Sequence, residues 1–257
     1  MSEAALRLVD AARTDVGRVR SVNEDSYISR PEINLWAVAD GMGGHENGQW
    51  ASQQIAASLA SVVPTDDFET DAGRVADAIH AANATIFNAS QASGKTMGST
   101  VVALLVNGRR FAVLWAGDSR VYLLRGGELY RLTRDHTQVQ DMVDRGLLAP
   151  EEAEHHPMSH VISRVVGVEQ ALELDAIQDE AEVGDVFLLC SDGLYGRVQD
   201  DEIAAALRAA RPAEATEGLI ELCLSRGAPD NVTILTIACD ELTLLSFGAS
   251  EEPTANE

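Results

Sequence analysis

Residues 35–45 read LWAVADGMGGH, an apolar run that ends abruptly at a single carboxylate, Asp40. Three glycines follow within four positions, at Gly41, Gly43 and Gly44. Glycine has no Cβ, so the backbone beyond Asp40 can approach a ligand closely. The pattern predicts a buried strand that stops at an acid, and it makes Asp40 the leading candidate for a metal ligand.

The combination of an apolar run and an acid occurs three more times, with the acid at Asp118, Asp192 and Asp230. Asp-Gly and Asp-Asn are common in turns, so each of these acids alone has a simple turn interpretation. Four carboxylates gathered at strand ends, however, repel one another unless cations neutralise them. Because hard oxygen ligands suit Mg²⁺ or Mn²⁺, the four acids together predict a site for such ions.

Length and composition are those of a soluble globular protein. The chain has 257 residues, and 46% of them are hydrophobic, which is ample for a folded core. We expect one domain over residues 1–240, because the four aspartates are spread between positions 40 and 230 and have to meet. Residues 241–257 are expected to form an acidic C-terminal tail.

The charge limits the partners. A net charge of -22 argues against nucleic acid or an anionic membrane. Lys95 is the only lysine, so a phosphate-binding cation is expected to be an arginine. The cysteines have no metal-motif spacing and are interpreted as buried, reduced thiols; they are Cys190, Cys223 and Cys239. With no signal sequence or apolar run of about 20 residues, we expect a cytoplasmic monomer with no membrane partner.

Hydrophobic periodicity predicts groups of strands and helices. The predicted strands are two within 6–30, then 100–106, 111–116, 120–124, 129–132, the run into Asp192, and 232–237. The predicted helices are 46–62, 73–90, 201–210 and 213–225. Asn107-Gly108 is a strong hairpin signal, so we expect the middle of the chain to be an antiparallel meander.

Residues 135–170 differ from the two strand-rich halves that they separate. They are polar, contain several histidines and include one short predicted helix at 139–144. Such an insertion is typical of a mobile flap over a site. Adjacent side chains rarely face one metal ion, so we expect the pair His155-His156 to lie on the surface.

The predicted elements indicate two packed antiparallel sheets flanked by helix pairs, with the acids at one end of the sandwich. Two cations about 3.5 to 4 Å apart, bridged by one carboxylate, acidify a shared water and hold it for in-line attack on phosphorus. Asp40 is best placed for that bridge, with the Gly41 carbonyl as a further ligand. Arg20 could clamp two phosphate oxygens through its planar fork.

Five motifs occur in a fixed order along the chain. They are Arg20-x-x-Asn23-Glu24-Asp25, Asp40-Gly41-Met42-Gly43-Gly44-His45, Gly117-Asp118-Ser119-Arg120, Ser191-Asp192-Gly193-Leu194 and Asp230-Asn231-x-Thr233. In this order, over about residues 6–240, they resemble the bacterial branch of the metal-dependent (type 2C) protein serine/threonine phosphatases. The resemblance implies a four-layer αββα sandwich that hydrolyses phosphoserine and phosphothreonine in proteins with Mn²⁺ or Mg²⁺.

The resemblance also implies the ligands of two metal ions. Asp40, Asp192 and Asp230 resemble the ligands of the first ion. Asp40 and the Gly41 carbonyl resemble ligands of the second. Asp40 and Asp192 are therefore implied to be catalytic.

Four further residues acquire roles by the same resemblance. Glu24 and Asp25 resemble the acids that act near the second ion, Glu24 through a water molecule. Asp118, together with Asp192, resembles the third and weaker metal site of bacterial members. Arg20 resembles the clamp for the substrate phosphate and completes the implied catalytic set, with two or three Mn²⁺ or Mg²⁺ ions in the site.

Met42 departs from the pattern of animal relatives. Those relatives place a histidine there that is thought to protonate the leaving alkoxide, whereas bacterial members share the methionine. A metal-bound water or another acid must then supply the proton. His45 is nearby in sequence, but a structural role at the start of the next helix is the alternative.

The preferred hypothesis is a phosphatase that acts on phosphorylated proteins and opposes a cognate bacterial Ser/Thr kinase. One alternative is a catalytically idle phosphoprotein-binding module of the same fold, which loss of the metal acids would favour. Another is a metal-dependent phosphodiesterase acting on small molecules, which a closed basic pocket would favour. All the metal acids are present, and the acidic chain gives no sign of a basic pocket.

Overall fold

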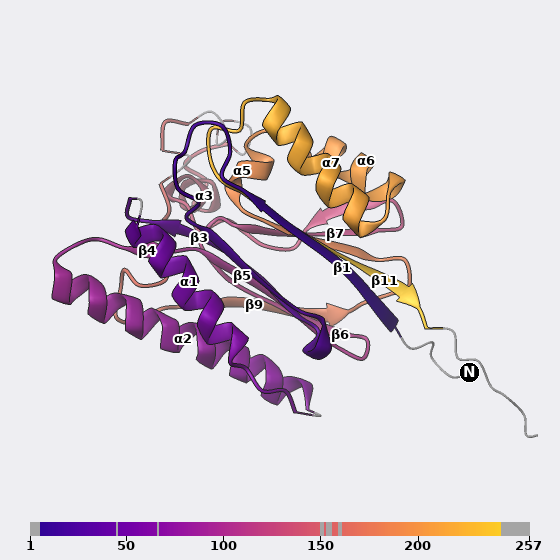
Figure 1. Ribbon diagram of the computed structural model, residues 1–257, viewed down its shortest axis with the longest axis horizontal. Helices are drawn as coiled ribbons and strands as arrows, with labels where there is room; N and C mark the ends of the chain where they lie inside the picture. Colours follow the sequence, from indigo (N-terminus) through magenta and orange to yellow (C-terminus); the bar gives the residue numbers. More distant parts are fainter. Residues whose placement is uncertain are drawn as a thin grey trace, which may run out of the picture.

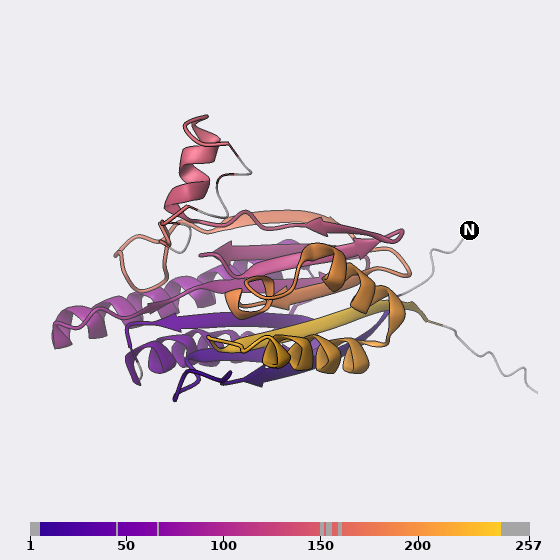
Figure 2. The same cartoon turned by 90° about the horizontal axis from the view of Figure 1, so that it is seen from above.

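A computed structural model describes residues 6–242, except 45, 66, 150, 151, 153–155, 159 and 160. His45, His155 and most of the predicted tail therefore lie outside the described residues. Within them, two antiparallel sheets pack face to face and helices cover both outer faces (Figures 1 and 2). The four-layer αββα sandwich predicted from the sequence is confirmed.

The first sheet contains both ends of the described chain. Its strand order is β1 (Leu6–Asp15), β11 (Val232–Glu241), β10 (Val186–Cys190), β7 (Arg120–Arg125) and β8 (Glu128–Arg131). β1 and β11 pair over ten residues, from Leu6 opposite Glu241 to Asp15 opposite Val232. This long ladder places the loop that follows β1 beside Asp230.

The second sheet contains the strand that ends at Asp40. Its order is β2 (Asp25–Arg30), β3 (Leu35–Met42), β5 (Val101–Asn107), β6 (Arg110–Ala116) and β9 (Asp175–Glu180). The short strand β4 (Gly98–Ser99) pairs with the end of β3. The predicted hairpin is confirmed: Asn107 ends β5 opposite Arg110, the turn is Gly108-Arg109, and Gly108 has a φ of 61°.

Two pairs of helices form the outer layers. The second sheet is covered by α1 (Glu46–Ala60) and α2 (Phe68–Ser93), and the first by α6 (Asp200–Ala209) and α7 (Pro212–Ser225). The shorter helices are η1 (Pro31–Ile33), α3 (Gln138–Asp144) and α5 (Asp192–Tyr195). None of the helices in the described part of the chain is long and apolar enough to span a membrane.

Strand β3 explains why the opening sequence is apolar without interruption. Trp36 and Val38 point into the core between the sheets, whereas Leu35, Ala37 and Ala39 face the helices α1 and α2. Alternate side chains of a strand point to opposite faces, so a strand buried on both faces must be apolar at every position. Burial on both faces ends at Asp40.

Several predicted boundaries were wrong. α2 begins at Phe68 rather than at residue 73, because Asp67 caps the helix by accepting a hydrogen bond from the Thr70 N–H. α1 ends at Ala60, not at residue 62, and β11 continues to Glu241. Strand β9 was not predicted, since Ala176 and Ile177 are its only apolar residues and it lies at a sheet edge.

The predicted meander was also wrong. The chain changes sheets between β6 and β7, so the four central strands form two hairpins in different layers. Gly117 permits the change, since it has a φ of 110° and a Cβ there would lie 2.6 Å from the Thr100 side chain. This crossing places Asp118 between the two sheets.

Candidate functional site

Two of the predicted site residues face each other directly. Asp25 begins β2 and Asp40 lies near the end of β3, and the register of the two strands pairs them. Two like charges opposite each other on neighbouring strands are destabilising. The pairing therefore calls for a cation or a shared proton between the carboxylates.

Asp25 is buried and only half satisfied. Its Oδ2 accepts hydrogen bonds from Ser191 Oγ at 2.8 Å and from Thr233 Oγ1 at 2.7 Å. Its Oδ1 is buried and has no hydrogen-bond partner within the described structure. Burial raises the pKa of Asp25 to about 7, against the two hydroxyl groups, which lower it. A buried carboxylate oxygen without a protein partner fits a position where a cation binds.

Asp40 is held by its backbone and surrounded by acids. Its N–H donates to Thr100 Oγ1 at 3.1 Å, and its carbonyl accepts from the Thr100 N–H at 2.9 Å. Burial is the main cause that raises the pKa of the Asp40 carboxyl, and four neighbouring carboxylates raise it further. They belong to Asp25, Asp192, Asp118 and Asp230. The structure thus brings together all five of these predicted acids.

Asp118 lies on the turn between the two sheets. It is buried, and its pKa is raised to about 7, mainly by burial and then by Asp192. Its backbone carbonyl accepts a hydrogen bond from the Tyr195 hydroxyl at 3.0 Å. Asp192 is the first residue of α5, which follows β10, and β10 pairs with β7, the strand that follows Asp118.

The Gly41 backbone approaches Glu24 and α1 closely. The Gly41 N–H donates to the Glu24 carbonyl at 3.1 Å. A Cβ on Gly41 would lie 2.1 Å from the Gly48 carbonyl oxygen, and a Cβ on Gly48 would lie 2.1 Å from Glu24 Oε2. Gly41 therefore requires glycine, because the atom it would strike is backbone, and the Glu24 carboxylate lies against the first turn of α1.

Arg20 reaches the site from the loop after β1. Its Nη2 donates to Asp230 Oδ2 at 2.7 Å, and the side chain is 55% exposed. Asn231 ties this loop to the start of β11. Its Oδ1 accepts from the Glu24 N–H, and its Nδ2 donates to two carbonyls of the loop, those of Val16 and Val22.

No role was predicted for Asn231, Ser191 or Thr233, although all three belong to motifs quoted from the sequence. Asn231 positions Glu24, and the two hydroxyl groups orient Asp25. Their place beside the acids in the motifs was the available signal. The partner of each depends on contacts across more than 150 residues of chain, which spacing cannot supply.

The residues present fit hard divalent cations. The candidate donors are oxygen atoms only, and one of them is the partnerless Asp25 Oδ1. Among the described residues, no three Asp, Glu, His or Cys side chains already form a closed metal cage. The acids are nevertheless close enough to raise the pKa values of Asp25, Asp40 and Asp118.

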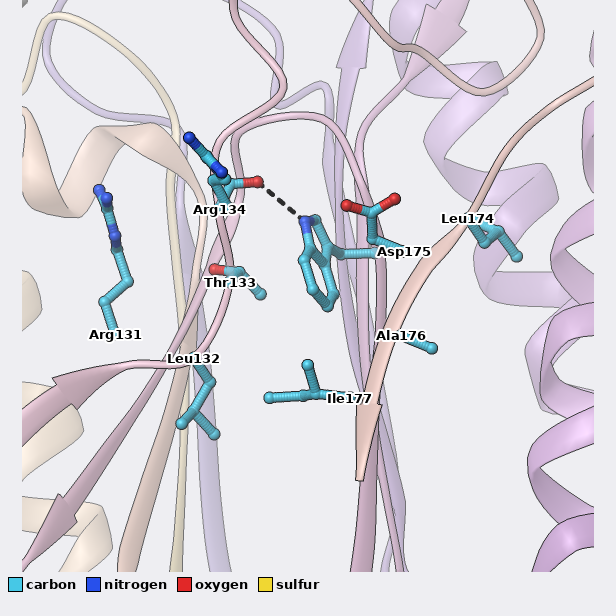
Figure 3. Close-up of a pocket in the computed structure, with 9 residues that line it drawn as sticks. Arg131, Leu132, Thr133, Arg134, Leu174, Asp175, Ala176 and Ile177 are labelled. Carbon is cyan, nitrogen blue, oxygen red and sulfur yellow. Dashed lines mark hydrogen bonds between the residues drawn. The ribbon is translucent and has the colours of Figure 1, made fainter. Parts of the chain in front are cut away.

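A separate open cleft of about 680 Å³ lies between the edge strands β8 and β9. Figure 3 shows Leu132 and Ile177 low in this cleft, with Arg134 and Asp175 at its upper end. None of the seven predicted metal ligands lines it. The cleft is therefore distinct from the cluster of acids.

Comparison with known proteins gives a consistent result. The family model described as Protein phosphatase 2C matches residues 15–141. The serine/threonine protein phosphatase PstP of Mycobacterium tuberculosis is 43% identical over 242 residues, which is 91% of this chain and 46% of PstP. The chain thus spans about half the length of that relative. The serine/threonine phosphatase stp of Listeria monocytogenes is 31% identical, over 89% of this chain and 94% of stp.

The fold agrees with a solved structure of the same kind. The catalytic domain of PstP, in complex with two manganese ions, superposes with a TM-score of 0.81 at 40% identity, over 92% of this chain and 100% of that domain. The sandwich fold, the ordered motifs and the near-complete coverage of the Listeria relative all indicate the same family. The chain belongs to the protein phosphatase 2C family.

Proposed function

We propose that this protein hydrolyses phosphoserine and phosphothreonine in other proteins, with Mn²⁺ or Mg²⁺ bound among the acids at the end of the sandwich. The observation that carries the proposal is the directly opposed pair Asp25 and Asp40, in which Asp25 Oδ1 is buried without a partner among the described residues. The phosphatase names of the relatives support it.

In this proposal the acids divide among the ions as the resemblance implied. Asp40, Asp192 and Asp230 would hold one ion, and Asp40 with the Gly41 carbonyl a second, beside Glu24 and Asp25. Asp118 would join Asp192 at a third. When bound, such ions act as Lewis acids and lower the pKa of a water molecule that attacks phosphorus.

Arg20 would bind the substrate phosphate. Its guanidinium group already donates to Asp230 through Nη2, and the side chain is half exposed. The planar fork can therefore turn toward two phosphate oxygens while staying near the carboxylates. This contact holds the phosphorus in line between the attacking water and the seryl or threonyl oxygen that leaves.

The leaving oxygen needs a proton when the P–O ester bond breaks. Met42 follows Gly41 at the site, but a thioether has no proton to give. We propose that a second water molecule donates this proton, and that it regains the proton which the attacking water loses as the new P–O bond forms. The products are inorganic phosphate and the free serine or threonine hydroxyl.

We propose that the protein acts in the cytoplasm, on phosphoproteins made by a Ser/Thr kinase. The three cysteines are free and buried, as is usual in a reducing compartment. The large negative charge disfavours anionic membranes and nucleic acid as partners.

Hydrolysis of a phosphothreonine peptide tests the proposal. The wild type and Asp192→Ala are compared in EDTA, Mg²⁺ and Mn²⁺, with Asp77→Ala on the exposed side of α2 as the matched control. We expect metal-dependent release of phosphate by the wild type and the control, and a loss of at least about 100-fold in Asp192→Ala. If the folded wild type shows no turnover with either metal, the proposed hydrolase activity is refuted, and the remaining interpretation is a phosphoprotein-binding module.

A further inference from the structure

His136 lies between the turn that carries Asp118 and the base of the flap. It is 7% exposed and precedes the segment that contains α3, which stands out from the sandwich in Figure 2. A buried histidine is most often a satisfied part of the core. The two ring nitrogens of His136 contact two different segments, the turn at Gly117 and the start of β9 at Asp175.

His136 forms two hydrogen bonds with Gly117, the residue before Asp118. The His136 N–H donates to the Gly117 carbonyl at 2.9 Å, and the Gly117 N–H donates to His136 Nδ1 at 3.1 Å. Because Nδ1 accepts a backbone hydrogen, the neutral ring carries its own proton on Nε2. The conformation of Gly117, and with it the direction in which Asp118 leaves the strand, depends on this reciprocal pair.

The other ring nitrogen of His136 faces Asp175, at the start of β9. Nε2 lies 3.2 Å from Asp175 Oδ2, to which it donates, and Asp175 Oδ1 accepts from Arg164 Nη1 at 2.5 Å. The ring stacks on Trp115, with 6.1 Å between centroids and 13° between planes. The Trp115 indole donates to the Arg134 carbonyl, the bond dashed in Figure 3, which also shows Asp175 at the upper end of the cleft.

The two ends of the flap meet at His136. We call residues 136–138 and 161–163 the flap stem. The Ser163 N–H donates to the His136 carbonyl at 2.8 Å, and the Gln138 N–H donates to the Val161 carbonyl at 2.9 Å. The residue that positions Gly117 thus also belongs to the hydrogen-bonded base of the flap.

We propose that His136 is a positioning residue that couples the flap stem to the turn carrying Asp118, so that the orientation of Asp118 and the order of the flap stem change together. The coupling needs both hydrogen bonds of the ring, which we call its two arms: Nδ1 accepts from the Gly117 N–H, and Nε2 donates to Asp175. By reciprocity, a cation held at Asp118 steadies the flap stem, and an ordered flap stem favours binding of that cation. The inference rests on the proposed metal site.

Two substitutions each preserve one arm. In His136→Asn, the amide oxygen can still accept from Gly117, but the side chain is too short for Asp175. In His136→Gln, the longer amide can still donate to Asp175, but no acceptor faces Gly117. The exposed His80 on α2 provides the matched control, His80→Asn.

Amide hydrogen exchange of Gln138 and Ser163, with and without saturating Mn²⁺, tests the coupling without requiring turnover. We expect Mn²⁺ to slow their exchange in the wild type and in His80→Asn. In His136→Asn and His136→Gln, this slowing should shrink by about fivefold or more, because each has lost one arm. Asp175→Ala should behave in the same way, and its partly exposed position makes it a mild change for the fold.

Two results would overturn the proposal. In one, Mn²⁺ leaves the flap stem of the wild type unchanged. In the other, the variants exchange faster by the same factor with and without Mn²⁺, which is the behaviour of a merely structural histidine. A wild type that shows Mn²⁺-dependent protection but no hydrolysis would contradict the proposed activity and leave the coupling intact.

Discussion

Replacing Asp25 by asparagine should stabilise the metal-free protein and remove part of its response to metal. Asp25 on β2 faces Asp40 on β3, and no group in the described part of the chain is a hydrogen-bond partner for its buried Oδ1. In Asp25→Asn, the amide oxygen can keep the hydrogen bonds from Ser191 and Thr233. The amide nitrogen would then face the other carboxylate as a donor, so a repulsion becomes a hydrogen bond.

The magnitude follows from the pKa of Asp25, which burial raises from 3.8 to about 7. An acid with a raised pKa in the folded state costs stability as the pH rises from the unfolded value to the folded value. At about 1.36 kcal/mol for each pH unit, the cost at pH 7 is at most about 4 kcal/mol. For a chain of this size, about 4 kcal/mol corresponds to a shift of about 8 to 16 °C in Tm.

The assay is thermal unfolding at pH 7.5 and pH 4.5, in EDTA and in excess Mn²⁺. In EDTA at pH 7.5, Asp25→Asn should melt above the wild type. At pH 4.5 its advantage should shrink to about 1 kcal/mol, because the folded acid is then protonated and the pH lies only slightly above the unfolded pKa of 3.8. Mn²⁺ at 100 times its Kd adds about 2.7 kcal/mol to a protein that binds it only when folded. The variant should gain less than the wild type.

The control is Asp77→Asn on the exposed side of α2, which should change neither Tm nor the effect of Mn²⁺. A lower Tm for Asp25→Asn than for the wild type in EDTA at pH 7.5 would refute the reasoning. An advantage of the same size at both pH values would refute it as well, because the cost would then not come from the charge.

Three further predictions concern the packing around the site and the sheets. Gly193→Ala places a Cβ 1.9 Å from the Asn231 carbonyl oxygen and should cost about 1–3 kcal/mol in a urea melt; an unchanged midpoint would contradict this contact. Arg125→Ala leaves the 1% exposed Asp185 carboxylate without its two charged hydrogen bonds and should cost about 3 kcal/mol, while adding Asp185→Asn should recover part of the loss in the same melt. A thiol reagent at pH 8 should modify Cys190, Cys223 and Cys239 only in urea. Burial raises the pKa of all three thiols, to about 11 for Cys223 and about 12 for Cys239. Rapid labelling of the native protein would argue against this packing.

Much of the architecture could be predicted because it depends on local pattern. The hairpin at Asn107-Gly108 and the helices at α1, α6 and α7 follow from turn chemistry and apolar spacing. β9 could not be found in this way, since an edge strand buries little of its surface and carries mostly polar residues. The start of α2 depends on one capping side chain, Asp67, rather than on the apolar stripe.

Asp40, Asp118, Asp192 and Asp230 were recognisable because each follows or precedes an apolar run beside glycine or proline, whereas Asp25 was implied only by the family resemblance. The structure brings all five aspartates to one end of the sandwich. Their roles as metal ligands, and that of Arg20 as the phosphate clamp, stay predictions. What each acid touches could not be read from spacing, since Asp25 meets hydroxyl groups 166 and 208 residues away.

The sequence by itself determined most of the strands and helices, though not β9, and four of the acids that stand at strand ends, because those depend on neighbours within a few positions. Only the tertiary structure decided that β6 and β7 lie in different sheets, that Asp25 opposes Asp40, and that His136 joins the Asp118 turn to the flap. Those arrangements depend on how two sheets pack and pair across the whole chain, and no local pattern encodes the register that places one carboxylate against another.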